Sequence, residues 1–165
     1  MIAKSYIEST LKEFEKWHND ASSPKKAIYF SKLAVIELCG WIEETVDDIV
    51  LRHSNRKLKN IDNKKYYIDK VIKNNYGFQY LQNIRPMLIN LIGLIGVEKL
   101  ENELEKTAQI TLLKNNLGNL KVSRNEAAHT HLKGITRTYN APSKTIGDFN
   151  RIFNVLEMLD SELRK

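Results

Sequence analysis

The segment SRNEAAHTH, residues 123–131, holds one arginine and two histidines at short spacing. Arg124 precedes His129 by five residues and His131 by seven. An arginine carries a permanent positive charge on a planar group that matches phosphate oxygens. A histidine can accept and return a proton near neutral pH. Such a pair could cleave RNA without a metal: the base removes the 2′-hydroxyl proton, the oxygen attacks the adjacent phosphate, and the arginine stabilises the developing charge.

This chemistry needs a base and an acid, whereas one pair supplies a single proton-transfer group. A second copy of the chain would supply the missing group, so the chemistry predicts a homodimer. Helical geometry leaves the choice of histidine open. On an ideal helix Arg124 and His129 lie about 140° apart with about 7.5 Å of rise, while His131 shares nearly the same face as Arg124. Within one chain His131 is the better partner, and a site shared between two chains relaxes that requirement.

The residues before this segment predict a helix from about residue 108 to residue 129. Its apolar stripe consists of Ile110, Leu113, Leu117 and Leu120. Arg124 continues the same spacing, so we expect it to face inward. A guanidinium in that position needs an anion or a carboxylate partner. The alternative to a catalytic role is therefore a structural salt bridge to an acidic residue of the second helix.

The rest of the chain also reads as helix, because glycine and proline total ten and period-two alternation is scarce. We expect helices at about 2–17, 25–53 and 65–74, one from about 78 that Pro86 kinks or restarts, one after Gly93 and Gly96, and a last one that begins near Thr145. Thr145 and Asp148 form the expected cap of that last helix. The basic segment 54–65 is expected as a loop and is a candidate mobile region.

The second of these helices has two distinct lines of residues. A core-facing seam contains Ile28, Val35, Cys39, Ile42, Val46 and Ile49. A wetter line passes through Gly40, Glu43 and Asp47. The length of 165 residues suits a single domain that spans residues 1–165. The predicted fold is an all-α bundle of about five to seven helices.

The net charge of +6 favours an anionic partner. Residues 52–73 contain eight Lys or Arg and two acids, and residues 114–144 contain six basic residues and one acid. These two clusters are the expected RNA-backbone contacts. The candidate RNA-binding residues are Arg52, Arg56, Lys57, Lys59, Lys133 and Arg137.

Other kinds of site find little support. The sequence has no P-loop and no HExxH. Its single cysteine, Cys39, cannot form an intramolecular disulfide and argues against a zinc site. We therefore expect neither a metal nor a cofactor. The apolar stretch 87–97 is too short to span a bilayer, and the segment MIAKSYIESTLKEF lacks the apolar region of a signal peptide. A protein of the reducing cytoplasm that does not enter the membrane is the expectation.

The hexapeptide RNEAAH resembles the nuclease motif of the HEPN superfamily, small helical domains of prokaryotic defence and toxin systems and of some eukaryotic RNA-processing proteins. In that motif an arginine, often followed by a polar residue, is separated from a histidine by four to six residues. LKNNLGNLKVSRNEAAH resembles the helix that leads into the motif. GLIGVEKLENELEKT and NAPSKTIGDFNRIFNVLEMLDSEL resemble neighbouring segments of the RiboL-PSP subgroup. LCGWIEETVDDIV resembles the second helix, where an acidic residue faces the cleft; Glu43 is the matching position, with Glu37 as a competitor.

The resemblance selects Arg124 and His129 as catalytic residues, with Asn125, Glu43 and His131 in support. It implies a HEPN-type bundle packed as a homodimer, and a metal-independent endoribonuclease whose products end in a 2′,3′-cyclic phosphate and a 5′-hydroxyl. It also implies a toxin or anti-phage role, with an antitoxin protein as a further partner. The alternative is a non-catalytic HEPN module that binds a nucleotide or RNA, or that serves only for dimerisation.

Overall fold

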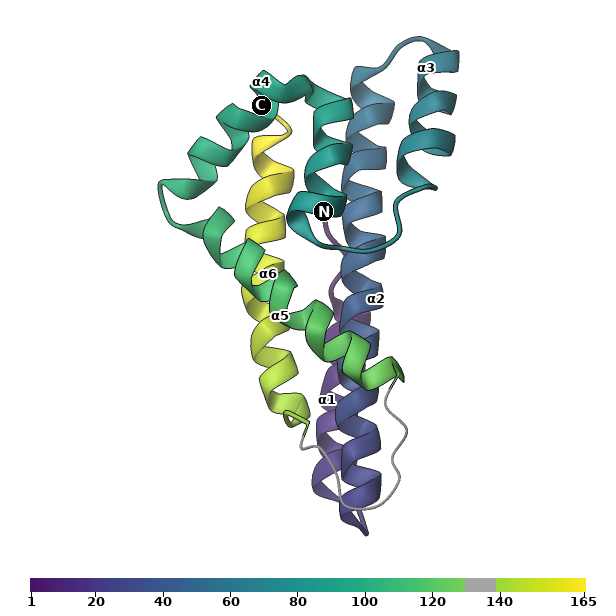
Figure 1. The fold of residues 1–165 in the computed structure, drawn as a ribbon, viewed down its shortest axis with the longest axis vertical. Helices are drawn as coiled ribbons and strands as arrows, with labels where there is room; N and C mark the ends of the chain where they lie inside the picture. The colour runs from purple at the N-terminus through teal and green to yellow at the C-terminus, as the bar shows by residue number, and fades with distance from the viewer. Residues whose placement is uncertain (130–138) are drawn as a thin grey trace.

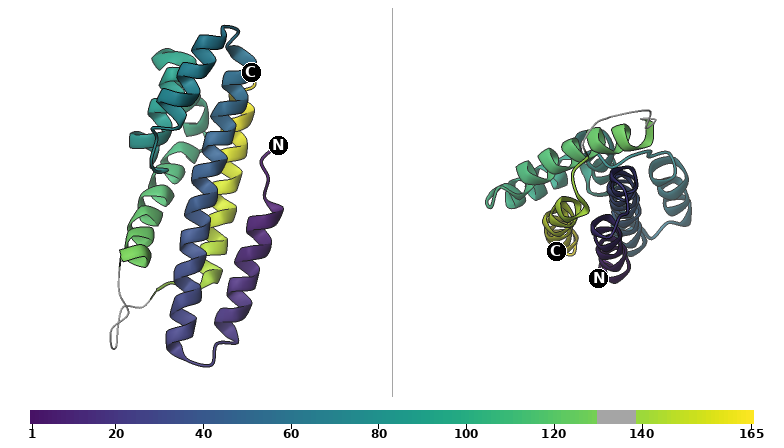
Figure 2. Two further views of the ribbon diagram at one scale, coloured as in Figure 1. Left: turned by 90° about the vertical axis from the view of Figure 1, so that its right-hand side faces the viewer. Right: turned by 90° about the horizontal axis from the view of Figure 1, so that it is seen from below.

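The computed structural model describes residues 1–129 and 139–165, which are helical and contain no β-strand. The helices are α1 (Ser5–Asn19), α2 (Pro24–Lys57), α3 (Ile61–Tyr66), α4 (Arg85–Glu105), α5 (Gln109–His129) and α6 (Pro142–Glu162), with two π-helical segments, η1 (Tyr67–Ile72) and η2 (Tyr80–Ile84). The prediction of an all-α bundle is confirmed for this part of the chain. α1, α2 and α6 pack against one another, and α5 crosses them obliquely (Figure 1 and Figure 2).

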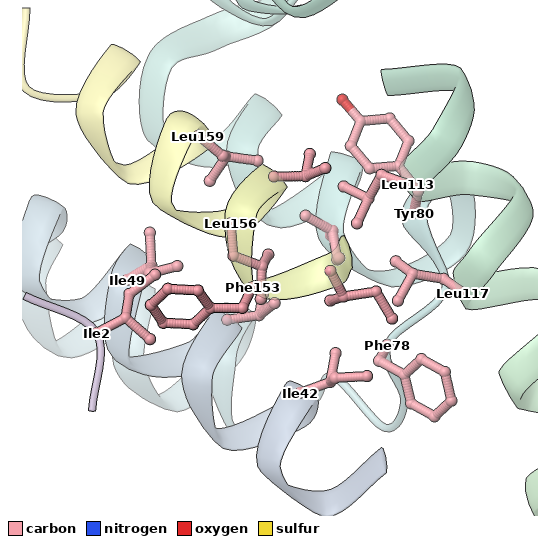
Figure 3. Close-up of a cluster of buried hydrophobic side chains, with 14 of the residues drawn as sticks. Ile2, Ile42, Ile49, Phe78, Tyr80, Leu113, Leu117, Phe153, Leu156 and Leu159 are labelled. Atoms are coloured by element: carbon pink, nitrogen blue, oxygen red, sulfur yellow. The ribbon is translucent and has the colours of Figure 1, made fainter. Parts of the chain in front are cut away.

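One cluster of buried apolar side chains connects the helices (Figure 3). Most of the seam expected on α2 lies in it: Val35, Cys39, Ile42, Val46 and Ile49 are buried. Ile28, the first residue of the expected seam, is only half-buried. The leucines of the α5 stripe face the same cluster and are buried as well. Since burying one large aliphatic side chain stabilises a fold by about 1.5–3 kcal/mol, this cluster fixes how α5 lies on α2.

The ends of α2 follow from local chemistry. Ser23 caps its N-terminus by accepting a hydrogen bond from the Lys26 amide, and Pro24 occupies the first turn, where a missing N–H costs nothing. The helix continues to Lys57, four residues beyond the expected end. Lysine and arginine are good helix formers, so the basic residues after His53 extend the helix.

The expectation of a basic loop over residues 54–65 is wrong. Only residues 58–60 separate α2 from α3. Asn60 starts α3, because its side-chain oxygen accepts hydrogen bonds from the amides of Asp62 and Asn63. This Asn cap converts the second half of the expected loop into a helix.

The cap expected at Thr145 and Asp148 is also wrong. α6 begins three residues earlier, with Pro142 in its first turn and Ala141 before it. Thr145 is buried inside the helix, and Asp148 pairs with Lys144 and Arg151. Proline in a first helical turn is a stronger start signal here than the threonine that follows it.

Two interruptions near α4 follow the sequence. Pro86 restarts the chain as an α-helix after η2, as expected. Gly93 breaks α4 with φ 72° and ψ 166°, a conformation that side chains disfavour. Gly96, expected to break the same run, is helical instead, and a Cβ there would meet Ile92.

Candidate functional site

The C-terminal end of α5 carries Arg124, and the expectation that this residue is buried is wrong. Arg124 is exposed, although Leu120 before it and Ala127 after it are buried. The residue keeps the spacing of the stripe, and it lines a pocket together with Glu43 of α2. A long arginine side chain can follow an apolar surface while its charged end stays in water.

Arg124 lies in the wall of a pocket of about 130 Å³. α2 contributes Glu43, and α5 contributes Lys121, Arg124 and Asn125. The remaining wall comes from the segment before η2 and from η2 itself: Tyr76, Gly77, Phe78, Gln79, Gln82 and Asn83. The structure therefore brings together three residues selected from the sequence, Glu43, Arg124 and Asn125. Glu37, the competitor of Glu43, is exposed and does not line this pocket.

The Arg124 side chain is not bound by the other charged or polar side chains of the pocket. Lys121 is hydrogen-bonded to the Gln79 side chain. Across residues 1–129 and 139–165, the Arg124 guanidinium forms no hydrogen bond or ion pair, so the structure contains no salt bridge from it to an α2 carboxylate in this part of the chain. A guanidinium without a partner beside a pocket is a suitable binding group for an anion such as phosphate.

Cys39, behind this wall, is not a nucleophile candidate. The thiol is buried, and burial raises its pKa to about 12 despite the opposing charge of Arg124. A thiol that stays protonated is unreactive. Cys39 is a small core residue, as expected.

The turn around Gly77 forms another part of the pocket wall and is held by hydrogen bonds of Asn83. Gly77 has φ +127°, and a Cβ built on it would lie 3.1 Å from Oδ1 of Asn83. The same Oδ1 accepts a hydrogen bond of 2.9 Å from the Gln79 amide. Nδ2 of Asn83 donates to Oδ1 of Asn75 at 3.0 Å and to the Tyr76 carbonyl at 3.3 Å. The Asn83 side chain therefore links the residues before Gly77, Asn75 and Tyr76, to Gln79 after it.

Replacing Gly77 by alanine is expected to destabilise the fold by about 1–3 kcal/mol, because alanine disfavours this positive φ and its Cβ crowds Asn83. The matched control is Gly118→Ala. Gly118 lies within α5 with open space around its Cβ, so alanine should stabilise the protein by about 0.5–1 kcal/mol. Urea unfolding of both variants measures the difference, and equal stabilities for the two would contradict this description of the turn.

The two histidines of the opening segment differ in what the structure describes. His129 is the last residue of α5; it is exposed and is not among the residues that line the pocket. His131 lies outside the described residues, as do Lys133 and Arg137. After that segment, Tyr139 donates a hydrogen bond of 3.2 Å to the Glu126 carbonyl, which ties the chain back to the end of α5.

The basic residues expected to bind RNA at the end of α2 are not part of this pocket. Arg56 lies thirteen residues after Glu43 on the same helix, a rise of about 20 Å. Arg56, Lys57 and Lys59 are exposed. Arg52 differs from them, because its guanidinium pairs with Asp48 at 2.8 Å and with Asp160 at 3.3 Å. Arg52 is thus a structural ion-pair residue in this chain.

That ion pair belongs to a buried cluster that periodicity did not indicate. Asp160 of α6 accepts hydrogen bonds from His53 at 3.0 Å, from Arg52 and from Arg164. His53 and Asp160 are 1% and 3% exposed. Burial, partly opposed by the bond to Asp160, lowers the pKa of His53. Because the Asp160 carboxylate accepts hydrogen bonds, Nε2 of His53 is the donor. The cluster fastens the end of α6 to the end of α2.

Asp47 lies one turn after Glu43 on the wetter line of α2. Burial and the neighbouring charge of Glu43 raise the pKa of Asp47 to about 6. Its Oδ1 is buried and has no hydrogen-bond partner within the described chain. Because the pKa of Asp47 is higher in the folded state, the free energy of unfolding decreases as this carboxyl ionises. The contribution of Asp47 to stability is fully present below pH 3.8 and is lost as the pH rises through about 6.

Replacing Asp47 by asparagine removes a negative charge that burial and Glu43 disfavour, so we expect the free energy of unfolding at pH 7.5 to increase. The gain should be about 1–2 kcal/mol, because partial contact with water weakens the effect. At pH 3.5, where the carboxyl is largely protonated in both states, the variant and the wild type should be nearly equally stable. Asp48→Asn is the control, because Asp48 is exposed and should show no such gain. Urea unfolding at the two pH values checks this, and a loss of stability at pH 7.5 for Asp47→Asn would contradict it.

The described part of the fold has neither a metal-binding cluster nor a membrane-spanning helix. Among residues 1–129 and 139–165, no group of three or more His, Cys, Asp or Glu side chains is arranged to hold a metal ion. No described helix has the length and apolar character needed to cross a membrane. Comparisons of the chain with protein-family models, curated proteins and solved structures found no match.

Proposed function

We propose that this protein is a metal-independent endoribonuclease of the HEPN type. The observation that carries the proposal is the exposed guanidinium of Arg124, which has no hydrogen bond or ion pair to residues 1–129 and 139–165 and shares a pocket with Asn125 and Glu43 near the end of α5. A protonatable side chain, His129, ends the same helix. These are the residues that the resemblance of RNEAAH to the nuclease motif of that superfamily selects.

In the proposed reaction Arg124 holds the scissile phosphate and stabilises the charge that develops on its oxygens. His129 removes the proton from the 2′-hydroxyl, whose oxygen attacks the phosphorus. The bond from phosphorus to the 5′-oxygen breaks, and that oxygen leaves with a proton. The products are a 2′,3′-cyclic phosphate and a 5′-hydroxyl. Asn125 and Glu43 shape the pocket around the phosphate.

The leaving oxygen needs an acid, and we assign this role to the histidine of a second chain. Both Arg124 and His129 are exposed in the single chain, so each is accessible to a partner copy. The active form is therefore proposed to be a homodimer with a composite cleft. A toxin or anti-phage effector of the cytoplasm, restrained by an antitoxin protein, is the biological role that the resemblance suggests.

The experiment that tests the proposal is incubation of the wild-type protein with labelled RNA in excess EDTA. We expect cleavage, with products that carry a 2′,3′-cyclic phosphate and a 5′-hydroxyl. Sedimentation at micromolar concentration should give the mass of a dimer. A protein that cuts none of a broad set of RNAs, or that remains a monomer, would contradict the proposal.

A second candidate function is a non-catalytic module that binds RNA or a nucleotide. It is favoured by one observation: His129 does not line the pocket that contains Arg124. Binding without cleavage in the same EDTA assay would select this alternative.

A further inference from the structure

Tyr76 is an aromatic side chain held out into water by a rigid backbone. It is 85% exposed, and it lines the pocket that contains Arg124. Phe78, two residues later, is 3% exposed and belongs to the core cluster with Ile42 and Leu117 (Figure 3). Gly77 separates the two rings, so the chain anchors one of them in the core and presents the other.

Hydrogen bonds to the backbone, and not contacts of its ring, hold Tyr76 in place. Asn83 donates to the Tyr76 carbonyl at 3.3 Å, and Asn75 donates to the Gly77 carbonyl at 3.1 Å. An exposed ring on a fixed backbone loses little conformational freedom when a flat ligand stacks on it. Exposure alone does not distinguish Tyr76, because Tyr6 is 82% exposed as well. Tyr76 differs in that it lines the pocket that contains Arg124 and lies on a backbone held by Asn75 and Asn83.

The neighbours of Tyr76 indicate which ligand this is. Gln82 and Asn125 are exposed amides on two sides of the same pocket, and Lys121 and Arg124 supply positive charge. Amide side chains can donate to and accept from the edge of a nucleobase, whereas arginine binds phosphate. An apolar segment of a protein partner would leave these amides and charges without partners.

We propose that this pocket is a nucleobase subsite. One base of a single-stranded RNA stacks on Tyr76, Gln82 and Asn125 contact its edge, and the phosphate attached to that nucleotide binds Arg124. The inference rests on the proposed function, because it assigns the nucleotide next to the scissile phosphate to a specific surface. Stacking tolerates every base, so the edge contacts carry any base preference.

The test measures binding of a fluorescein-labelled 2′-O-methyl oligoribonucleotide, which the proposed reaction cannot cleave because its 2′-oxygens are blocked. Tyr76→Ala is expected to raise the Kd by about 5- to 100-fold, the usual effect of removing one stacking platform. Tyr76→Phe should stay within about twofold of wild type, because the ring is retained. Tyr6→Ala is the matched control: Tyr6 is 82% exposed on α1 and should leave the Kd unchanged. Circular dichroism should show all four proteins equally folded, since both tyrosines are exposed.

The same oligonucleotide with abasic sites separates base stacking from attraction to the backbone. Wild type and Tyr76→Ala should bind it equally. A Kd for the intact oligonucleotide that is the same in wild type and Tyr76→Ala, or no binding by wild type, would overturn the subsite. The two proposals fail separately: binding that depends on Tyr76 without any cleavage in EDTA keeps the subsite and rejects the nuclease, and cleavage that is indifferent to Tyr76 does the reverse.

Discussion

Replacement of Arg124 by alanine is expected to reduce the rate of RNA cleavage in EDTA by a factor of about 10²–10³, the usual effect of removing one group that stabilises a developing anion. The reason is local, because Arg124 is the guanidinium of the pocket and forms no ion pair within the described chain that would give it a structural role. Arg124→Lys should recover only part of the rate, since lysine keeps the charge but lacks the planar fork.

His129→Ala is expected to reduce the same rate by about 10²–10⁴, the contribution of one positioned acid or base. Arg151→Ala and His18→Ala are matched controls on other helices and should cleave at the wild-type rate. All four variants should unfold at nearly the wild-type midpoint, because none of the four side chains is buried. Full activity in His129→Ala would mean that the protein is a ribonuclease but that another residue transfers the proton. His131 would then be the next residue to replace.

The second large effect concerns stability. Replacement of Asp160 by alanine is expected to lower the free energy of unfolding at pH 7 by about 2–4 kcal/mol, because it removes the buried acceptor shared by His53, Arg52 and Arg164. The loss should stay below the largest values for breaking a buried ion pair. The reason is that the side chains of Arg52 and Arg164 are 28% and 47% exposed, so both charges can be hydrated in the variant. Urea unfolding at pH 7 provides the measurement.

Asp69→Ala is the control for this prediction. Asp69 pairs with Lys73 on an exposed surface, at 2.8 Å, and its loss should leave the unfolding midpoint unchanged within error. The pH dependence gives an independent check. Burial opposes ionisation of Asp160, but the hydrogen bonds from His53 and Arg164 and the two arginine charges outweigh burial and lower its pKa. Its stabilising contribution is therefore present above pH 3.8 and is lost at lower pH, so wild type and Asp160→Ala should converge in acid. An unchanged midpoint at pH 7 would contradict the role of the cluster.

Local patterns in the sequence predicted most of the helices. The three- and four-residue spacing on α2 and α5 identified buried faces, because such spacing is a direct consequence of helix geometry. Pro86 predicted a restart for a similarly local reason. The start of α6 was not predicted, because the Thr145 and Asp148 pattern placed it three residues after Pro142, which occupies the first turn.

What the sequence could not predict depends on contacts between distant segments. Arg124 keeps the spacing of the core stripe, but spacing does not reveal where the neighbouring helices stop covering α5. The pairing of His53 with Asp160 joins residues 107 positions apart. The turn around Gly77 depends on Asn83 in the next helical segment, and the only local signal for it was the glycine itself. Of the predicted site, Glu43, Arg124 and Asn125 meet in one pocket, while the basic residues at the end of α2 lie far from it.

The most direct test of the proposed site is single-turnover cleavage of one RNA in EDTA by wild type and by the Arg124→Ala/His129→Ala double variant, with matched unfolding midpoints. The predicted result is cleavage by wild type that leaves a 2′,3′-cyclic phosphate, and none above background by the double variant. No cleavage by wild type, or equal cleavage by both proteins, would contradict the assignment of a metal-independent ribonuclease to these two residues.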